Sequence, residues 1–332
     1  MKNTYYHTFS IIIPSLNEEN YIADCLNSIL KQDYDTEKIE IIISDGYSTD
    51  KTRSIIADYI RTHKNIILVD NPEKKTPQAL NIGIKNSHNE VVVILGAHTK
   101  LDNNFIKYNN YYLNTKNVMV SGGTQINVGK TFVQKLIGTV MEIPFAFGSA
   151  NYRWSTKEQY VDTVVYAAYK RELFDEVGYF EERMTISEDA EFNWRIRQAG
   201  YKIFYSPQII SYYYPRNSIK KFIKQLFRYG ILRVNVLKKH IDAIKVMHLI
   251  PPGFVLLLVT FLTASFFSVT ALKIISVLML VYFAISILLT LIKLPAKKVA
   301  FLPMIPILIF SMHIAWGTGF LVGLFSPKSK EY

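Results

Sequence analysis

The stretch FSIIIPSLNE, residues Phe9–Glu18, decides the fold, because it is a strand that ends in proline and polar residues. Ser10–Ile13 is rich in β-branched side chains, which favour strands. Glu18–Leu30 has apolar residues at helical spacing, and Ile39–Ser44 is again a strand, ending in DGYSTD at Asp45–Asp50. The chain therefore begins as an alternation of strands and helices.

The alternation continues through the first hundred residues. We expect helices at Lys51–Ile60 and Pro77–Lys85, and strands at Ile66–Val69 and Val91–Leu95. Strands that alternate with helices predict a mostly parallel sheet covered on both faces. Ligands of such sheets bind in the crevice outside the carboxyl ends of the strands.

Three short motifs begin where a predicted strand ends, and each contains a polar residue: Pro14-Ser15, Asp45-Gly46 and Gly96-Ala97-His98. Each has a structural alternative. Asp and Gly are favoured in plain turns, and a lone histidine is usually structural. Their shared position at strand ends predicts a ligand site at one edge of the sheet.

An acidic pair opens a later helix. Asp189–Ala199 is predicted to be helical, with Ser187 as its N-cap and Gly200 closing it. Acids in a first helical turn also offset the helix dipole, which is the structural alternative for Glu188 and Asp189. The functional interpretation is that a carboxylate here takes a proton from a substrate hydroxyl.

The apolar residues of the 332-residue chain are concentrated after Leu249. Phe254–Phe267, Ile274–Ile292 and Val299–Phe325 are almost free of charge. A bilayer core needs roughly 20 apolar helical residues, a length that the first stretch reaches only with its flanks. We expect about three membrane spans in 249–325, with a buried core as the alternative.

The net charge of +11 is uneven, and nine basic residues against one acid lie between Arg216 and His248. Apolar residues recur there at helical spacing, which predicts an amphipathic helix at a membrane surface that attracts anionic lipids. Nucleic acid is the rival partner for a basic segment. The position beside the predicted spans favours lipid, and we expect no nucleic acid.

Together with Gln225-Leu226-Phe227-Arg228-Tyr229, these motifs resemble the family 2 glycosyltransferases, nucleotide-sugar-dependent α/β enzymes of GT-A fold. The runs at Phe147–Arg153, Arg171–Gly178 and His313–Phe320 resemble the succinoglycan-biosynthesis ExoA-type membrane enzymes. The resemblance implies a Rossmann-like, mostly parallel GT-A domain at 1–215, an interfacial helix at 216–248, transmembrane helices at 249–325 and a tail at 326–332.

The resemblance also implies roles for single residues. The nucleotide-sugar site would comprise Pro14, Asn17, Glu18, Asp45, Gly46, Ala97 and His98. Asp189 would be the general base, with Glu188 the less favoured candidate. Gln225, Arg228 and Tyr229 would lie on the acceptor and diphosphate side.

Two positions depart from the pattern of the family. Ser44 replaces the first of two commonly paired acids, so Asp45 alone would accept the uracil N3–H. Gly96-Ala97-His98 stands where the family has Asp-x-Asp, whose acids hold a divalent metal on the diphosphate. His98 would then hold Mn²⁺ or Mg²⁺, and an imidazole suits manganese better.

The implied activity is inverting transfer from a UDP-hexose to a polyprenyl-diphosphate-linked acceptor, in polysaccharide or glycolipid synthesis. The enzyme would lie in the cytoplasmic membrane with its catalytic domain on the cytoplasmic side. Gly96 prompts one alternative, a catalytically degenerate glycosyltransferase fold that serves as a binding or scaffold subunit. A transport or anchoring protein is the other, disfavoured by the lack of charge within the spans.

The charges beside the spans predict the topology. Lys293, Lys297 and Lys298 mark the second connection as cytoplasmic by the positive-inside bias. Three spans then leave 326–332 outside. Pro303 and Pro306 favour a re-entrant hairpin as the alternative, which would return the tail to the inside.

Overall fold

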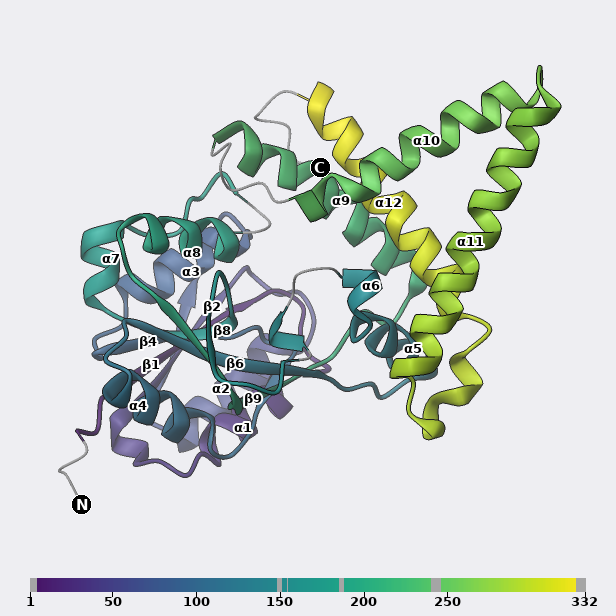
Figure 1. Cartoon of the computed structure of the whole chain (residues 1–332). Helices are drawn as coiled ribbons and strands as arrows, with labels where there is room; N and C mark the ends of the chain where they lie inside the picture. Colours follow the sequence, from purple (N-terminus) through teal and green to yellow (C-terminus); the bar gives the residue numbers. More distant parts are fainter. Residues whose placement is uncertain (1–4, 148–150, 154, 185–187, 240–245, 327–332) are drawn as a thin grey trace. The chain divides into compact units, whose positions relative to one another are not determined.

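The structure is a computed structural model that describes residues 5–147, 151–153, 155–184, 188–239 and 246–326. The chain forms two compact units, which we treat separately (Figure 1). The first comprises Met1–Ile126 and Asn151–Tyr213, and the second comprises Asn127–Ala150 and Tyr214–Tyr332.

The first unit is an α/β sandwich built on one sheet. The predicted strands and helices of the first hundred residues are all present, with ends that agree or differ by at most four residues. Its elements are β1 (Phe9–Ser15), α1 (Ile22–Leu30), η1 (Thr36–Lys38), β2 (Ile39–Asp45), α2 (Thr52–Thr62), β3 (Ile66–Asp70), α3 (Thr76–Lys85), β4 (Val91–Ile94), β5 (Thr99–Leu101), α4 (Phe105–Thr115), β6 (Val120–Asn127), η2 (Asn151–Arg153), β7 (Gln159–Val161), β8 (Val165–Lys170), α7 (Glu172–Val177), α8 (Glu188–Gln198) and β9 (Ile203–Tyr213).

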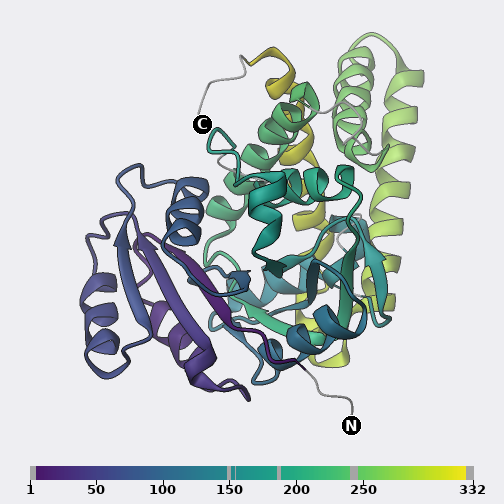
Figure 2. The ribbon, with the colours of Figure 1, turned by 90° about the vertical axis from the view of Figure 1, so that its left-hand side faces the viewer.

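The sheet is mixed, with strand order β3-β2-β1-β4-β8-β6-β9-β5 and with β7 paired to β9. The first four strands run parallel, as predicted. β8 then pairs antiparallel with both β4 and β6. Figure 2 shows the N-terminal strands in purple and blue with helices beside them.

The central strand β1 supplies side chains to two separate cores. Phe9, Ile11 and Ile13 are buried in a cluster with residues of α1 and α4. Ile12 is buried in a second cluster with Leu80 of α3. Because successive side chains of a strand point to opposite faces, this run of isoleucines requires helices on both faces of the sheet.

The sheet opens between β1 and β4, where the strand order reverses. The ladder between these strands ends at Ile12 and Ile94, whereas β1 stays paired to β2 as far as Ser15 and Asp45. The backbone of Pro14 faces the β4 side of β1, beyond the point where the ladder to β4 ends. Because no strand there would accept a hydrogen bond, the lack of an N–H in proline costs no ladder bond. Such a switch point is where open α/β sheets bind ligands.

The second unit is helical. Among its described residues, three helices are long and apolar enough to cross a membrane: Val246–Ser265, Val269–Lys293 and Ile305–Phe325. Its elements are α5 (Phe132–Met141), α6 (Pro144–Phe147), α9 (Ile219–Lys239), η4 (Val246–His248), α10 (Ile250–Ser265), α11 (Val269–Lys293), η5 (Ala296–Phe301) and α12 (Ile305–Phe325).

The last apolar stretch, predicted from Val299, is not one continuous helix. η5 ends at Phe301 and α12 begins at Ile305, because proline cannot donate within a helix and is tolerated only in its first turn. Pro303 lies in the break, and Pro306 lies in the first turn of α12.

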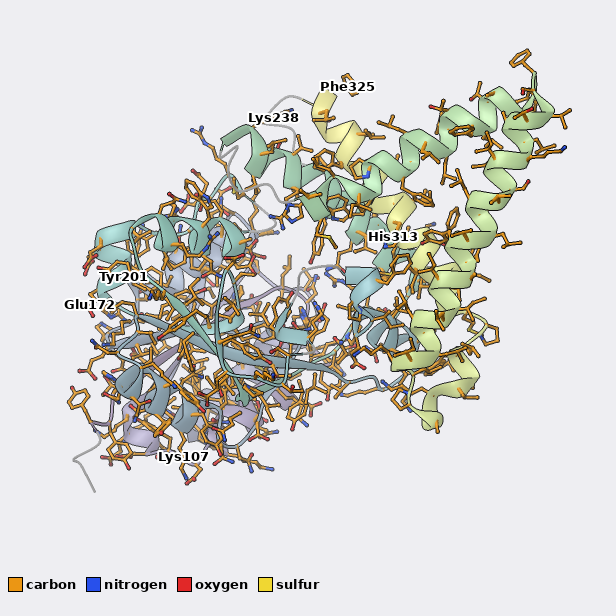
Figure 3. All side chains as sticks on the ribbon, in the orientation of Figure 1. Lys107, Glu172, Tyr201, Lys238, His313 and Phe325 are labelled. Atoms are coloured by element: carbon orange, nitrogen blue, oxygen red, sulfur yellow. The ribbon has the colours of Figure 1, made fainter. Side chains whose placement is uncertain are left out.

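Glycines bring α9 and α12 into close contact. A Cβ on Gly319 would lie 2.0 Å from the Phe227 carbonyl oxygen, and one on Gly230 would lie 2.2 Å from the Trp316 carbonyl oxygen. Lys238 donates to the carbonyl oxygens of Gly323 and Ser326 at 2.8 and 2.7 Å, which caps the end of α12 (Figure 3). The amphipathic helix is therefore packed along the last apolar helix.

The segment 127–147, which the sequence places in the catalytic domain, packs within the second unit instead. Phe132 meets Phe301 at a ring distance of 5.1 Å, and Lys298 bonds Glu142 at 3.3 Å. His313, labelled in Figure 3, lies 3.0 Å from the Phe145 carbonyl oxygen. The apolar α5 joins the helical unit because its own face needs apolar partners.

Candidate active site

Two loops at the carboxyl ends of β1 and β2 are tied into one platform. Asn17 has a left-handed backbone (φ 56°), a conformation that asparagine tolerates. Its N–H donates to Ser48 Oγ at 2.8 Å, and its side-chain oxygen accepts from the Thr49 N–H at 2.8 Å. The polar ends of the two strands are therefore held together at the predicted site.

Asp45 organises its own loop. Its carboxylate is buried and accepts from the N–H and the hydroxyl of Ser48, at 2.9 and 2.6 Å, and from Arg53 at 3.1 Å. Arg53 also bonds Asp70 at 2.8 Å. Three hydrogen bonds leave this carboxylate one of its about four acceptor positions for a uracil N3–H, so that role stays a prediction.

Neighbouring positions explain the small residues of this motif. A Cβ on Gly46 would lie 3.3 Å from Lys74 Cα, a close approach that favours glycine. A Cβ on Gly83 of α3 would lie 3.0 Å from Ser44 Oγ. The hydroxyl of Ser44 thus faces α3, where a larger acid would collide.

His98 is paired with Glu18. The His98 Nδ1 lies 3.0 Å from Glu18 Oε1, and the ring contacts Tyr213 at a centroid distance of 5.3 Å. Because a carboxylate only accepts, Nδ1 carries a proton, which leaves Nε2 as the nitrogen that faces away from Glu18. Ala97, which precedes His98 in the chain, is buried and has no polar side chain to offer a ligand.

The donor set at His98 fits a metal only weakly. Within the described ranges, no group of three His, Cys, Asp or Glu side chains is placed to hold an ion. His98 with an orienting carboxylate is the arrangement of many histidine ligands. A Cβ on Gly96 would lie 3.4 Å from Thr99 and 3.6 Å from Tyr166, which are ordinary contacts. The space at Gly96 would therefore admit the first acid of an Asp-x-Asp motif.

The acidic pair opens α8, which begins at Glu188, one residue before the predicted start. Asp189 accepts from the Ala190 N–H at 2.7 Å. Burial, followed by the neighbouring Asp189 charge, raises the pKa of Glu188 to about 8. The two adjacent carboxyls therefore resist ionising together. The predicted cap Ser187 lies outside the described residues.

Other polar residues of α8 anchor it to the unit. Glu191 is buried and bonds Arg195 through both oxygens, at 3.0 Å each to Nε. Asn193 accepts from the Tyr169 hydroxyl at 3.2 Å and donates to Thr163 at 2.8 Å. Glu191 is therefore held inside the unit by Arg195.

The remaining predicted residues lie on α9 in the second unit. Gln225 donates to the Tyr229 hydroxyl at 2.8 Å. The Nε of Arg228 is buried and makes no hydrogen bond within the described part of the chain. Such a donor usually has a partner, so Arg228 is the member of this motif whose environment points to a ligand.

Sequence reasoning missed two residues of this region. Arg53 joins Asp45 to Asp70, and Tyr213 packs on His98. Neither belongs to a strand-end motif. Arg53 reads as an ordinary helix residue, and Tyr213 carries no sequence signal that links it to the strand-end motifs. Only the closing of the sheet brings them to these partners.

Comparisons with known proteins agree with this architecture. The family model for glycosyl transferase family 2 matches residues 10–178. The chain is 32% identical, over 96% of its length and 98% of the relative's, to the dolichyl N-acetyl-alpha-D-glucosaminyl phosphate 3-beta-D-2,3-diacetamido-2,3-dideoxy-beta-D-glucuronosyltransferase of Methanococcus voltae. It is 23% identical to the succinoglycan biosynthesis protein ExoA of Rhizobium meliloti, over 53% of this chain and 54% of the relative.

A solved structure shares the fold. The mannosyltransferase of Pyrobaculum calidifontis, in complex with GDP-Man and Mn²⁺, superposes with a TM-score of 0.64 and 19% identity, over 94% of this chain and 88% of that one. The predicted GT-A fold with a helical C-terminal region is confirmed. By its matched domain and its near full-length relative, the chain belongs to glycosyl transferase family 2 and is a glycosyltransferase.

Proposed function

We propose that this glycosyltransferase moves a sugar, with inversion, from a nucleotide-sugar donor to a lipid-linked saccharide, and that UDP-hexoses are its donors. The observation that carries the mechanism is the pair of adjacent carboxyls at the start of α8. Two neighbouring carboxyls do not both ionise readily, and because the pKa of Glu188 is raised, we assign the proton to Glu188 and the negative charge to Asp189. When two carboxyls of a pair differ in pKa in this way, the one that keeps its proton can act as an acid and the ionised one as a base.

The proposed step is a single displacement. The acceptor hydroxyl attacks the anomeric carbon and forms the new glycosidic bond, while Asp189 takes the hydroxyl proton. The bond from the anomeric carbon to the diphosphate oxygen breaks, and the nucleoside diphosphate leaves with its electron pair. One displacement inverts the anomeric centre.

A divalent ion would be held by Nε2 of His98, with Glu18 fixing the ring through Nδ1. When bound, such an ion offsets the charge that develops on the leaving diphosphate. One imidazole is a weak site by itself, so we propose that the diphosphate of the donor completes the ligand set. The ion would then bind with the donor rather than before it.

We propose a phosphate-linked lipid saccharide as the acceptor. The Methanococcus voltae relative is named for a dolichyl-phosphate-linked N-acetylglucosamine acceptor. The buried Nε of Arg228, which makes no hydrogen bond to any described residue, would meet an acceptor phosphate. Arg228→Lys keeps the charge but loses this donor, and we expect a raised KM for the lipid acceptor with an unchanged KM for the donor.

The membrane setting is part of the proposal. The three apolar helices would anchor the enzyme in the cytoplasmic membrane. The basic residues of α9 would attract anionic lipids. The catalytic unit would face the cytoplasm, where nucleotide sugars are made available to it.

The test is a donor screen on membranes that contain the protein. UDP-glucose, UDP-N-acetylglucosamine and GDP-mannose are offered with polyprenyl-phosphate-linked and polyprenyl-diphosphate-linked saccharides, and nucleotide release is measured, with Asp189→Asn as the matched control. Release that needs both a donor and a lipid acceptor supports the proposal. Nucleotide binding without release from any pair would favour the degenerate, scaffolding alternative.

A further inference from the structure

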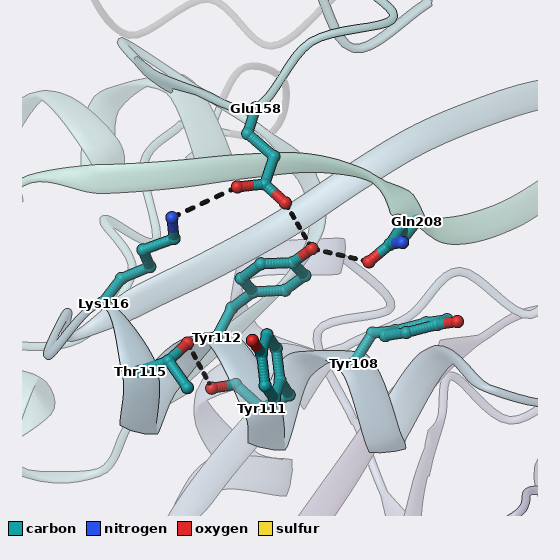
Figure 4. A pocket seen from close by; sticks show the side chains of 7 residues that line it. All are labelled: Tyr108, Tyr111, Tyr112, Thr115, Lys116, Glu158 and Gln208. Carbon is teal, nitrogen blue, oxygen red and sulfur yellow. Dashed lines mark hydrogen bonds and ion pairs between the residues drawn. The ribbon is translucent and has the colours of Figure 1, made fainter.

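A hollow in the first unit lies apart from the strand-end motifs. It measures about 430 Å³, within the range of small-molecule sites. Its lining comes from α4, from the segment before β7 and from β9, and consists of Tyr108, Tyr111, Tyr112, Thr115, Lys116, Glu158 and Gln208 (Figure 4).

The strand register separates this hollow from the catalytic crevice. Thr115 and Lys116 lead into β6, whose first residue Val120 pairs with Tyr169. Tyr169 in turn pairs with Val92, at the amino end of β4. The crevice motifs follow the carboxyl ends of β1, β2 and β4, so the C-terminal end of α4 lies toward the opposite edge of the sheet.

The hydroxyl of the buried Tyr112 connects the polar side chains that line one wall of the hollow. Tyr112 Oη lies 2.5 Å from Glu158 Oε1 and 2.6 Å from Gln208 Oε1 (Figure 4). Hydrogen bonding to Tyr112 and Lys116 lowers the pKa of Glu158, so this carboxyl is ionised. One amide atom of Gln208 contacts the Tyr112 hydroxyl. In either orientation of the amide, the other atom makes no side-chain hydrogen bond among the described residues.

Tyrosine rings form the other wall. Tyr111 is 49% exposed, and its ring meets Tyr112 edge-on at 5.0 Å and 80°. Figure 4 shows Tyr111 next to the Tyr112 ring and Tyr108 farther along the same helix. An exposed aromatic face beside hydrogen-bonding groups suits a ligand with an apolar face and a hydroxylated rim, as in a pyranose ring.

The charges of the hollow balance. Lys116 Nζ lies 3.2 Å from Glu158 Oε2, and the pair sets donors next to an acceptor. Each of two adjacent sugar hydroxyls both donates and accepts, so a vicinal diol matches such a pair. Because the lining carries one positive and one negative side chain, it offers no net attraction to an anion.

From this lining we infer a saccharide-binding site on α4, distinct from the catalytic crevice, that takes a neutral hexose unit stacked on Tyr111. The inference does not depend on the identity of the donor or of the lipid acceptor. A site of this kind would let the enzyme hold a glycan chain at a distance from the reacting sugar.

The test uses the full chain in nanodiscs with saturating UDP to occupy the crevice. Cellobiose, maltose and N,N′-diacetylchitobiose are titrated by calorimetry and by saturation-transfer NMR. We expect at least one to bind, and Tyr111→Ala to weaken its binding by about tenfold, the value of a lost aromatic contact. The charge-neutralised Lys116→Met/Glu158→Gln variant should also lose binding.

Tyr160→Ala removes another exposed tyrosine that does not line the hollow, and it should bind as the wild type does. UDP affinity and melting temperature should be unchanged in Tyr111→Ala. The inference is overturned if no probe binds, or if Tyr111→Ala and Tyr160→Ala behave alike. It is also overturned if Tyr111→Ala changes the oligomeric state instead, since the hollow would then be a protein contact.

Discussion

At the scale of single residues, Glu188 and Asp189 give the sharpest comparison. If Asp189 takes the acceptor proton, Asp189→Asn should lower the transfer rate by at least about two orders of magnitude, a typical general-base effect. Glu188→Gln imitates the protonated side chain and should keep most of the activity. Turnover with the lipid-linked acceptor measures both, and donor binding should survive in each.

The reverse pattern, with Glu188→Gln inactive and Asp189→Asn active, would move the base to Glu188. Equal loss in the two variants would mean that the pair acts as a unit.

The raised pKa of Glu188 has a consequence for stability. Native Glu188 keeps a proton up to about pH 8, whereas the unfolded side chain loses it near 4.5. The native state therefore binds more protons within this window, and the free energy of unfolding falls as the pH rises through it. Glu188→Gln should flatten that dependence and stabilise the protein at alkaline pH. Melting temperatures measured across the window test this, and parallel curves for the two proteins would contradict it.

Gly96 tests the proposed metal. If the lone His98 holds an ion weakly, Gly96→Asp should tighten Mn²⁺ binding in the presence of UDP, because its Cβ has room and its carboxylate adds a ligand. Calorimetry of Mn²⁺ binding measures this independently of turnover, with Gly96→Asn as the uncharged control. Full wild-type activity in excess chelator would refute a metal role.

At the scale of helices, the contact between α9 and α12 depends on glycine. Gly319→Ala would place a Cβ 2.0 Å from the Phe227 carbonyl oxygen, so the helices must separate. We expect a loss of about 1–3 kcal/mol, the usual cost of overpacking. Gly253→Ala on α10 meets nothing within 4 Å and is the matched control. Thermal unfolding in detergent measures both, and equal melting temperatures would show that the glycine contact is not needed.

At the scale of the whole molecule, the open question is the topology in the membrane. The positive-inside bias of Lys293 and Lys298 predicts three spans and an external tail. A cysteine in place of Ser329, with Cys25→Ser to remove the native thiol, should react with an impermeant thiol reagent in intact cells. Labelling only after lysis would instead support the re-entrant arrangement that Pro303 introduces.

Local sequence determined the order of elements in the catalytic unit and the position of its motifs. The β-branched run of Ser10–Ile13, the end of β2 at Asp45 and the acidic start of α8 depend on neighbours in the chain, so their periodicity and composition predict them. The apolar helices after residue 245 follow from length and composition in the same way.

Only the tertiary structure decided which side chains are engaged with one another. The pairing of His98 with Glu18 joins residues 80 positions apart, and Arg53 reaches Asp45 only when the loop after β2 closes. The placement of 127–147 with the C-terminal helices likewise depends on which apolar surface is available after folding. Such contacts are set by how distant elements pack, and no periodicity along the chain records them.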